Sequence, residues 1–185
     1  GAHVVLISTD LVFDGTKATP YVETDEPDPI SVYGRTKLLA EQAVGGAHTI
    51  VRTSWVNGGP PDQPVDDMVR TVLRLAATGR PMHFVDDQIG RPTFTADLVP
   101  AIVALGLDRA GGTWHVTNQG SCSWFEFARA TLEAAGLDPG QVRPIATTDL
   151  RPVRPARRPA NSVLDDAALR SAGRDRLPPF GPSLQ

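Results

Sequence analysis

Two short stretches near the start of the chain carry side chains that could perform acid–base chemistry on a carbonyl group. The apolar run HVVLI ends in Ser8, Thr9 and Asp10. Further along, SVYGRTK places Tyr33 four residues before Lys37. Ligands bind at the carboxyl ends of strands in open parallel sheets, where a threonine hydroxyl can donate a hydrogen bond and a carboxylate can accept one. The local alternative is that Thr9 caps the strand end and Asp10 forms a turn with its own backbone.

Tyr33 and Lys37 lie on one face if their stretch is helical, so the ammonium can sit close to the phenol. A free tyrosine has a pKa of about 10, and a nearby cation lowers it by favouring the phenolate. Tyr33 is therefore a candidate general acid for a carbonyl that is being reduced. The alternative is an exposed helical pair worth roughly a few tenths of a kcal/mol, and Y-x-x-x-K alone is common by chance.

The elements that would position these side chains alternate between β-branched runs and helical patterns, which is typical of a parallel sheet covered by helices. The first strand, 3–9, is expected to be buried on both faces because its apolar residues are continuous. Ser123 and Glu126 form a capping-box pattern before a helix that runs to about Ala135. The other predicted strands are 48–54, 82–85, 113–117 and 142–146, and the other predicted helices are 31–44, 66–78, 95–107 and 165–171.

These elements predict an α/β fold with two parts. Residues 1–80 read as the C-terminal part of a doubly wound parallel sheet, and residues 81–185 read as a smaller α/β portion that binds substrate. The boundary is soft, because parallel strands can leave such a sheet and re-enter it, so segments of the two parts can interleave.

The composition is that of an ordinary globular protein and argues against several classes of partner. Of 185 residues, 41% are hydrophobic and 21% charged, and the net charge of -3 provides no basic field for nucleic acid or an anionic membrane. We therefore expect a small-molecule ligand. The four histidines lack metal-ligand spacing, so no metal site is expected. With Cys122 as the single cysteine and no leader or bilayer-length apolar stretch, the cytoplasm is the expected compartment.

Together the motifs are more specific than any one of them. S-T-D is followed by D-E-P-D-P-I-S-V-Y-G-R-T-K-L-L-A-E and by R-T-S-W, then by D-D-Q-I-G-R-P-T at 86–93, G-S-C-S-W at 120–124 and A-R-R-P-A-N-S-V-L-D at 156–165. This set resembles the extended short-chain dehydrogenase/reductases that act on nucleotide sugars, and within them the dTDP-4-dehydrorhamnose reductase family. The resemblance covers nearly the whole chain in the same order, and it implies a Rossmann-like NAD(P)-binding domain.

The resemblance implies an oxidoreductase of dTDP-L-rhamnose biosynthesis that reduces the 4-keto group of a dTDP-4-dehydro-6-deoxyhexose with NADPH or NADH. Thr9 would polarise the carbonyl and Tyr33 would protonate its oxygen. Lys37 would tune Tyr33 and bind the nicotinamide ribose, and Ser54, at the end of the next strand, would also contact the cofactor. A homodimer is compatible with the resemblance, but the oligomeric state stays open.

The resemblance also implies contacts with the substrate. Asp10 and Trp55 would contact the deoxysugar, Trp55 through a flat apolar face, although a core tryptophan after a strand is a serious alternative. Arg91, or the pair Arg157 and Arg158, would meet the diphosphate, because guanidinium groups match phosphate oxygens. A structural role, in which these arginines brace a proline-rich segment, is about as well supported.

The chain departs from the family pattern in one respect, because no glycine-rich loop of the type G-x-x-G-x-x-G or G-x-G-x-x-G follows a strand. In the family that loop lies in a segment that would precede Gly1. We therefore expect these residues to be one portion of a larger reductase and to be inactive alone, and the residue that would choose between NADPH and NADH would lie in the same segment.

Three alternatives stay open from the sequence. The first is another nucleotide-sugar reductase or epimerase, since substrates that differ at one ring carbon cannot be separated by motif. The second is a non-catalytic binding subunit of the same fold, although such a protein would not need Thr9, Tyr33 and Lys37 together. The third is a folded remnant or oligomerisation surface, which would leave Asp10 and Trp55 without ligands. No acidic cluster suggests magnesium.

Overall fold

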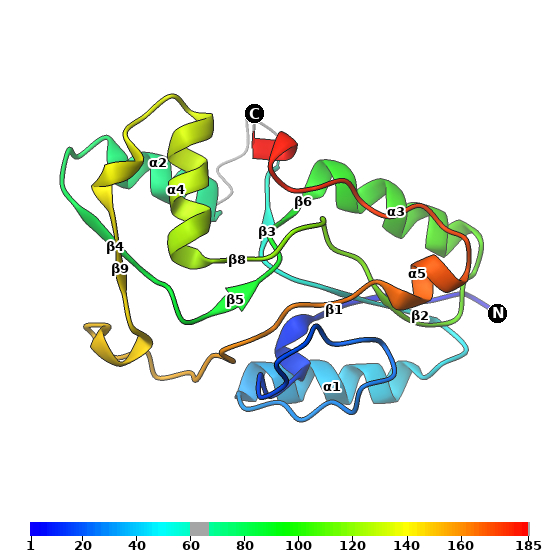
Figure 1. The fold of residues 1–185 in the computed structure, drawn as a ribbon. Helices are drawn as coiled ribbons and strands as arrows, with labels where there is room; N and C mark the ends of the chain where they lie inside the picture. The colour runs from blue at the N-terminus through cyan, green and yellow to red at the C-terminus, as the bar shows by residue number, and fades with distance from the viewer. Residues whose placement is uncertain (60–66, 185) are drawn as a thin grey trace.

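A three-stranded parallel sheet with a helix on each face forms the centre of the structure. This computed structural model describes residues 1–59 and 67–184. Strand β2 (Thr49–Thr53) lies between β1 (Val5–Thr9) and β7 (Gly112–His115). Helix α1 (Val32–Val44) covers one face and α3 (Thr95–Leu107) covers the other (Figure 1). The predicted α/β class and the helix-covered parallel sheet are confirmed.

Apolar clusters fasten these helices to the sheet. Val51 of β2 is fully buried and packs with Leu105 of α3 and with the short helix α5 (Ala167–Ser171). On the opposite face Leu38 of α1 packs against a cluster that includes the buried ring of Phe13. Burial of apolar side chains is the main stabilising term in folding, so these clusters hold both helices in place against the two faces of the sheet.

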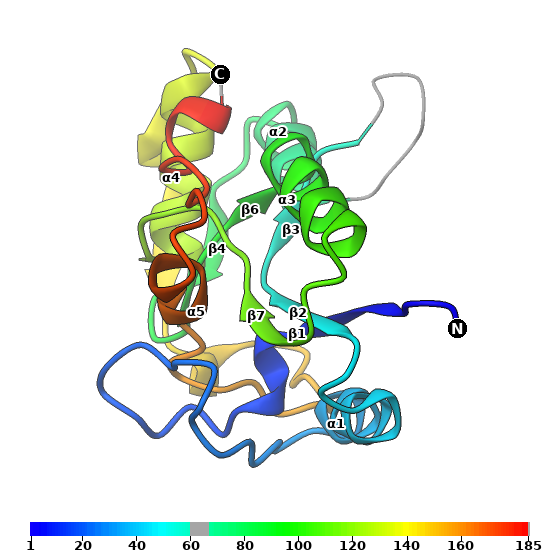
Figure 2. The same cartoon turned by 90° about the vertical axis from the view of Figure 1, so that its right-hand side faces the viewer.

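A second group of elements packs beside the sheet, in the left part of Figure 1. Strands β4 and β9 pair in parallel, and helices α2 and α4 share an apolar core with them. Two pairs of very short strands, β3 with β6 and β5 with β8, lie between this group and the main sheet. Figure 2 shows α4 on one side of β3 and β6, and α2 with α3 on the other. The bounds are α2 (Met68–Ala76), α4 (Trp124–Ala134), β3 (Val56–Asn57), β4 (Met82–Val85), β5 (Ile89–Gly90), β6 (Thr93–Phe94), β8 (Cys122–Ser123) and β9 (Val142–Ile145).

Local sequence signals place the first residues of α1 and α4. The hydroxyl of Ser31 accepts a hydrogen bond from the Gly34 amide at 3.1 Å and so caps α1. Gly34 also lets α1 approach the chain after β1, because a Cβ at this position would lie 2.1 Å from the Leu11 carbonyl oxygen. The predicted capping box of α4 is confirmed, since the Ser123 hydroxyl accepts from the Glu126 amide at 3.0 Å and the Glu126 carboxylate accepts from the Ser123 amide at 2.8 Å.

The first strand differs from its prediction in burial. It begins at Val5, and Ile7 within it is 39% exposed. The expectation that this strand is buried on both faces was therefore wrong. Among the residues that the structure describes, β1 pairs with β2 alone, so its other edge has no neighbour here, whereas the central strand β2 is buried along its whole length.

The other predicted helices and strands agree with the observed ones or differ from them by a few residues at their ends. The strand 82–85 and the helix 95–107 agree with the structure, and the strand predicted at 113–117 is Gly112–His115. The helix predicted at 66–78 is observed at Met68–Ala76, and its predicted first residue, Asp66, lies outside the described residues. The two-residue strands were missed, because such short pairs carry no periodic pattern.

The two groups of elements interleave along the chain. Helix α2 precedes residue 80 and packs with β4, β9 and α4, whereas β7 follows that residue and pairs with β2. A boundary at residue 80 stays a prediction.

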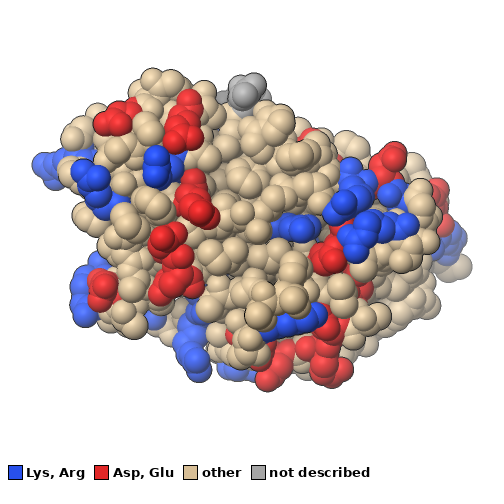
Figure 3. Space-filling view, in the orientation of Figure 1, with Lys and Arg blue, Asp and Glu red and all other residues tan. Residues whose placement is uncertain are grey.

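The surface shows no field of one charge on the face that Figure 3 presents. Acidic and basic side chains alternate there around a broad uncharged centre (Figure 3). Among the residues that the structure describes, no helix has both the length and the apolar character that crossing a membrane requires.

Candidate active site

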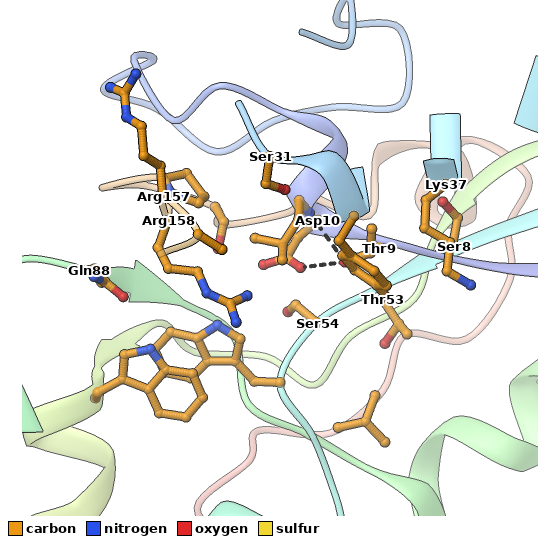
Figure 4. Close-up of a pocket in the computed structure, with 18 of the residues that line it drawn as sticks. Ser8, Thr9, Asp10, Ser31, Lys37, Thr53, Ser54, Gln88, Arg157 and Arg158 are labelled. Atoms are coloured by element: carbon orange, nitrogen blue, oxygen red, sulfur yellow. Dashed lines mark hydrogen bonds between the residues drawn. The ribbon is translucent and has the colours of Figure 1, made fainter. Parts of the chain in front are cut away.

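A cavity of about 620 Å³ opens at the carboxyl ends of β1 and β2, between the main sheet and the second group of elements. This is the position at which open parallel sheets bind ligands. Figure 4 shows Arg157, Arg158 and Gln88 on one side of the cavity, Ser8 and Lys37 on the other, and Asp10 between them. Of the predicted site residues, Thr9, Asp10, Tyr33, Lys37, Ser54, Trp55, Arg157 and Arg158 line this cavity.

Thr9 and Asp10 form a buried polar pair at the end of β1. The Thr9 hydroxyl donates to Asp10 Oδ1 at 3.0 Å and accepts from the Leu11 amide at 3.2 Å (Figure 4). It thus caps a short 3-10 helix, as the local alternative predicted, and lines the cavity as well. Asp10 Oδ2 is buried and has no hydrogen-bond partner in the described part of the chain.

Burial raises the pKa of Asp10 to about 6. The hydroxyls of Ser162 and Thr9 and the positive charge of Arg158 act in the opposite direction, but they do not offset the loss of hydration. A buried carboxylate with a free oxygen at the wall of a cavity is an acceptor for a ligand hydroxyl. The pair can therefore both hold a carbonyl oxygen, through Thr9, and accept from a hydroxyl, through Asp10.

Tyr33 and Lys37 lie on the first turns of α1 and face the same cavity. Their side chains lie on the same side of α1 because residues four apart share a helix face, and Lys37 Nζ lies 6.0 Å from the centroid of the Tyr33 ring. Tyr33 is 51% exposed. Lys37 donates to the carbonyl oxygen of Ile7 at 3.1 Å, which ties the helix to β1. A phenol and an ammonium at one cavity wall can deliver a proton to a bound carbonyl oxygen.

Beneath these residues lies a buried ion pair that sequence reasoning missed. Arg52 of β2 donates to both carboxylate oxygens of Glu41 on α1, at 3.0 and 2.7 Å, and Ser8 donates to the same carboxylate. The guanidinium also lies 5.1 Å from the Phe13 ring centroid. Glu41 ends the quoted stretch L-L-A-E, one turn after Lys37 on the same helix face, and Arg52 begins R-T-S-W, but neither stretch shows that the two side chains pair. The ion pair fixes α1 against the strand ends.

The aromatic wall of the cavity consists of two indoles. Trp55 and Trp124 stack with ring centroids 3.5 Å apart and an interplanar angle of 9°. Trp55 has φ of 44°, a left-handed conformation that non-glycine residues rarely adopt. The sequence predicted Trp55 as a site residue but not Trp124, although Trp124 ends the G-S-C-S-W stretch and directly follows the N-cap Ser123.

The predicted arginines separate into two groups. Arg157 and Arg158 line the cavity, together with Arg154, which was not predicted. The structure does not bring Arg91 to the cavity wall, since its Nε and Nη1 are buried elsewhere and lie in the field of Asp166. Its carbonyl oxygen accepts from the hydroxyl of Ser54 at 2.6 Å, and neither Nε nor Nη1 has a hydrogen-bond partner among the described residues.

Within residues 1–59 and 67–184, no three His, Cys, Asp or Glu side chains are grouped so that they could hold a metal ion. Burial raises the pKa of the Cys122 thiol to about 12, so this cysteine is a protonated, apolar filler.

Comparisons with known proteins agree on one family. The family model described as RmlD substrate binding domain matches residues 1–185. The spore coat polysaccharide biosynthesis protein SpsK of Bacillus subtilis is 42% identical over 176 residues, which are 94% of this chain and 59% of that protein. A dTDP-4-dehydrorhamnose reductase of Mycolicibacterium smegmatis is 42% identical over 191 residues, which are 100% of this chain and 56% of that protein.

Solved structures lead to the same family. The chain is similar to the crystal structure of dTDP-4-dehydrorhamnose reductase from Bacillus anthracis in complex with NADP, with a TM-score of 0.89 and 38% identity over 99% of this chain. The structure of a dTDP-4-dehydrorhamnose reductase from Clostridium acetobutylicum also has a TM-score of 0.89, at 36% identity. The chain spans 64% of each of these proteins.

Proposed function

Because the chain belongs to the RmlD substrate binding domain family, we propose that it forms the substrate-binding and catalytic part of an NAD(P)H-dependent nucleotide-sugar reductase. The reaction is reduction of the 4-keto group of a dTDP-4-dehydro-6-deoxyhexose, with dTDP-4-dehydrorhamnose as the expected substrate. One observation carries this proposal: Thr9, Tyr33 and Lys37 reach a single cavity at the strand ends, from two elements that the sequence separates.

The chemistry follows from the positions of these side chains. The Thr9 hydroxyl holds the substrate carbonyl oxygen by turning its hydrogen bond away from Asp10. The phenol of Tyr33 gives its proton to that oxygen, which becomes the hydroxyl group of the product. Asp10 accepts from a neighbouring sugar hydroxyl through its free Oδ2, which orients the ring. Lys37 stabilises the phenolate that remains, because an ammonium beside it favours the charged form.

The residues fit the nicotinamide end of a cofactor. Lys37 has three donors and a single acceptor, the Ile7 carbonyl, among the described residues, so two donors are free for ribose hydroxyls. Ser54, which also lines the cavity, is proposed to contact the cofactor. When bound, NADPH or NADH supplies the hydride that reduces the carbonyl carbon. The choice between the two cofactors stays open, although the similar Bacillus anthracis protein was crystallised with NADP.

The remaining walls suit a nucleotide sugar. Arg154, Arg157 and Arg158 are exposed and place three guanidinium groups at the cavity, which is suited to a diphosphate. The positive charges of these arginines favour an anionic ligand at this cavity, although the protein as a whole has a net charge of -3. We further propose that the protein acts in the cytoplasm, consistent with its single cysteine, and a homodimer stays a prediction.

The test is consumption of NADPH by the natural full-length protein with enzymatically prepared dTDP-4-dehydrorhamnose. Tyr33→Phe removes the transferable proton and is expected to lower turnover by roughly a hundred- to ten-thousandfold. Tyr21→Phe is the matched control, since the chain has two tyrosines and the Tyr21 hydroxyl donates to Asp14 at 2.7 Å, away from the cavity. The control should lose stability and keep turnover. If the wild type binds the dTDP-sugar without turnover, the protein is a binding subunit, and the proposal is wrong.

A further inference from the structure

Both faces of the Trp55 indole are occupied. Trp124 covers one face. On Gly90, an added Cβ would lie 2.4 Å from Cε2, 2.6 Å from Nε1 and 2.7 Å from Cζ2 of Trp55. The ring-fusion atom Cε2 is the nearest of the three, so Gly90 approaches a face of the ring and not its edge. Since Trp124 fills the space over one face, the backbone of Gly90 must lie against the other.

Trp55 is therefore the middle layer of a sandwich, and Trp124 is the outer one. Trp124 lines the cavity and is half-buried, and it touches Phe127 edge-on with ring centroids 6.4 Å apart. A ring that is covered on both faces cannot offer a face to a ligand unless a neighbour leaves. Trp124 lies on the cavity side of this stack as one of the lining residues, so we assign ligand contact to its ring.

Helix α4 holds Trp124 in place. Trp124 is the first residue of α4, directly after the capping box of Ser123 and Glu126. The Ser123 hydroxyl lies 2.6 Å from a carboxylate oxygen of Asp86, to which it donates. A side chain at such a doubly fixed helix start has little freedom, which lowers the entropic cost of using it as a binding surface.

The surroundings of the sandwich suit a sugar with an apolar face. Val56, Met68 and Ile89 line the same cavity. No acceptor is found for the indole N–H of Trp55 or Trp124 in the described part of the chain, whereas Trp114 Nε1, outside the cavity, donates to Ala110 O at 3.1 Å. Two free donors on an otherwise apolar wall match a deoxyhexose, which presents C–H groups together with a few hydroxyl oxygens.

We infer that Trp124 is a substrate-binding residue, and that its indole face, not that of Trp55, contacts the sugar of the bound nucleotide sugar. Trp55 acts through Trp124 as its support, and Gly90 supports Trp55. This inference rests on the proposed function for the identity of the sugar, but not on turnover.

The test compares two ligands by calorimetry in the natural full-length protein: dTDP-L-rhamnose, which carries the sugar, and dTDP, which lacks it. Trp124→Ala is expected to weaken binding of dTDP-L-rhamnose by about tenfold and to leave dTDP unchanged. Trp124→Phe, which keeps a flat ring and guards against misfolding, should lose about threefold. Trp114→Phe is the matched control and should bind both ligands as the wild type does.

Circular dichroism separates the two tryptophans. Closely stacked indoles give an exciton couplet, which should be present in the difference spectrum between wild type and Trp124→Phe and absent for Trp114→Phe. The couplet should persist when dTDP-L-rhamnose saturates the protein. If it disappears on saturation, or if Trp124→Ala and Trp124→Phe bind dTDP-L-rhamnose normally, the sugar reaches Trp55 and the inference is overturned. Failure of the wild type to bind either ligand would instead overturn the proposed function.

Discussion

Two buried polar clusters lie on consecutive residue pairs, or rungs, of the β1–β2 ladder, and they differ in whether the carboxylate has partners for both of its oxygens. On the first rung Ser8 pairs with Arg52, and Glu41 closes the cluster from α1. These three side chains are between 4% and 5% exposed, and both carboxylate oxygens have partners. On the next rung are Thr9 and, directly after it, Asp10, which is equally buried but has one oxygen without a partner.

The contrast extends across the second rung. Thr53, opposite Thr9, also has a buried hydroxyl oxygen without a partner. Within the described residues the first cluster also has one unpaired atom, Nη1 of Arg52, but both oxygens of its carboxylate are satisfied. Buried polar groups are almost always hydrogen-bonded, so a concentration of unsatisfied ones at a cavity wall marks groups that a ligand completes. The first cluster, whose carboxylate is satisfied, holds α1 on the sheet, and we propose that the second leaves its polar atoms unpaired for a ligand.

Glu41→Gln should break the satisfied cluster and have the largest effect on stability. It leaves the buried Arg52 charge unpaired, which is expected to lower the free energy of unfolding by about 3–5 kcal/mol. Urea denaturation measures this loss. Glu133→Gln is the matched control, because the Arg129–Glu133 pair is about half exposed and should contribute at most about 0.5 kcal/mol. Equal losses in the two variants would contradict the structural role of the buried pair.

Asp10→Asn should stabilise the protein in a pH-dependent way. Burial raises the pKa of Asp10 from 3.8 to about 6, so the folded state resists ionisation of this group. The wild type should therefore lose up to about 3 kcal/mol relative to the variant as pH rises from about 4 through about 6, and the two should be equally stable below that range. Urea unfolding at both ends of this range measures the difference.

Asp166→Asn is the control for the sign of that effect. Burial acts to raise the pKa of Asp166, but hydrogen bonds from Arg176 and Gln119, and the charges of Arg176 and Arg170, outweigh it and lower the pKa to about 2. This variant should be less stable than the wild type at neutral pH, with the deficit shrinking as pH falls from about 4 toward about 2. If both variants shift stability in the same direction, the contrast between the clusters is wrong.

Ser8→Ala tests how far the satisfied cluster depends on its third member. The variant removes one hydrogen bond to a charged carboxylate but keeps both bonds from Arg52, so a loss of about 1–2 kcal/mol is expected in urea unfolding. The KM for the nucleotide sugar should stay unchanged, since the substrate contacts are assigned to the neighbouring rung. A raised KM with unchanged stability would move Ser8 into the binding site.

Lys37→Met should have the smallest effect on stability and a large one on function. The ammonium is half-buried and has one carbonyl partner, so its loss should change the free energy of unfolding by less than about 1 kcal/mol. Turnover should fall by at least about a hundredfold, because the phenolate of Tyr33 loses its neighbouring cation. Thermal melting measures the stability and the NADPH assay measures the turnover of one preparation. Unchanged turnover would remove Lys37 from the proposed mechanism.

The predicted order of strands and helices was largely correct, and the misses share a cause. Ile7 is more exposed than the apolar run predicted, because within the described residues β1 has a neighbouring strand on one side alone. The two-residue strands were missed because their pairing depends on neighbours far along the chain. Among the arginines, the motif did not show that Arg91 is turned away while Arg158 lines the cavity.

The sequence by itself determined the local geometry of this protein. The spacing of Tyr33 and Lys37 puts both on one helix face, and Ser123 with Glu126 starts α4, because these interactions act within four residues of the chain. Only the tertiary structure decided which groups meet across the fold. The pairing of Glu41 with Arg52 follows from how α1 packs on the sheet, and the stacking of Trp124 on its partner indole follows from how two distant segments pack at the cavity. Such contacts depend on strand order and layer packing, which no local pattern encodes.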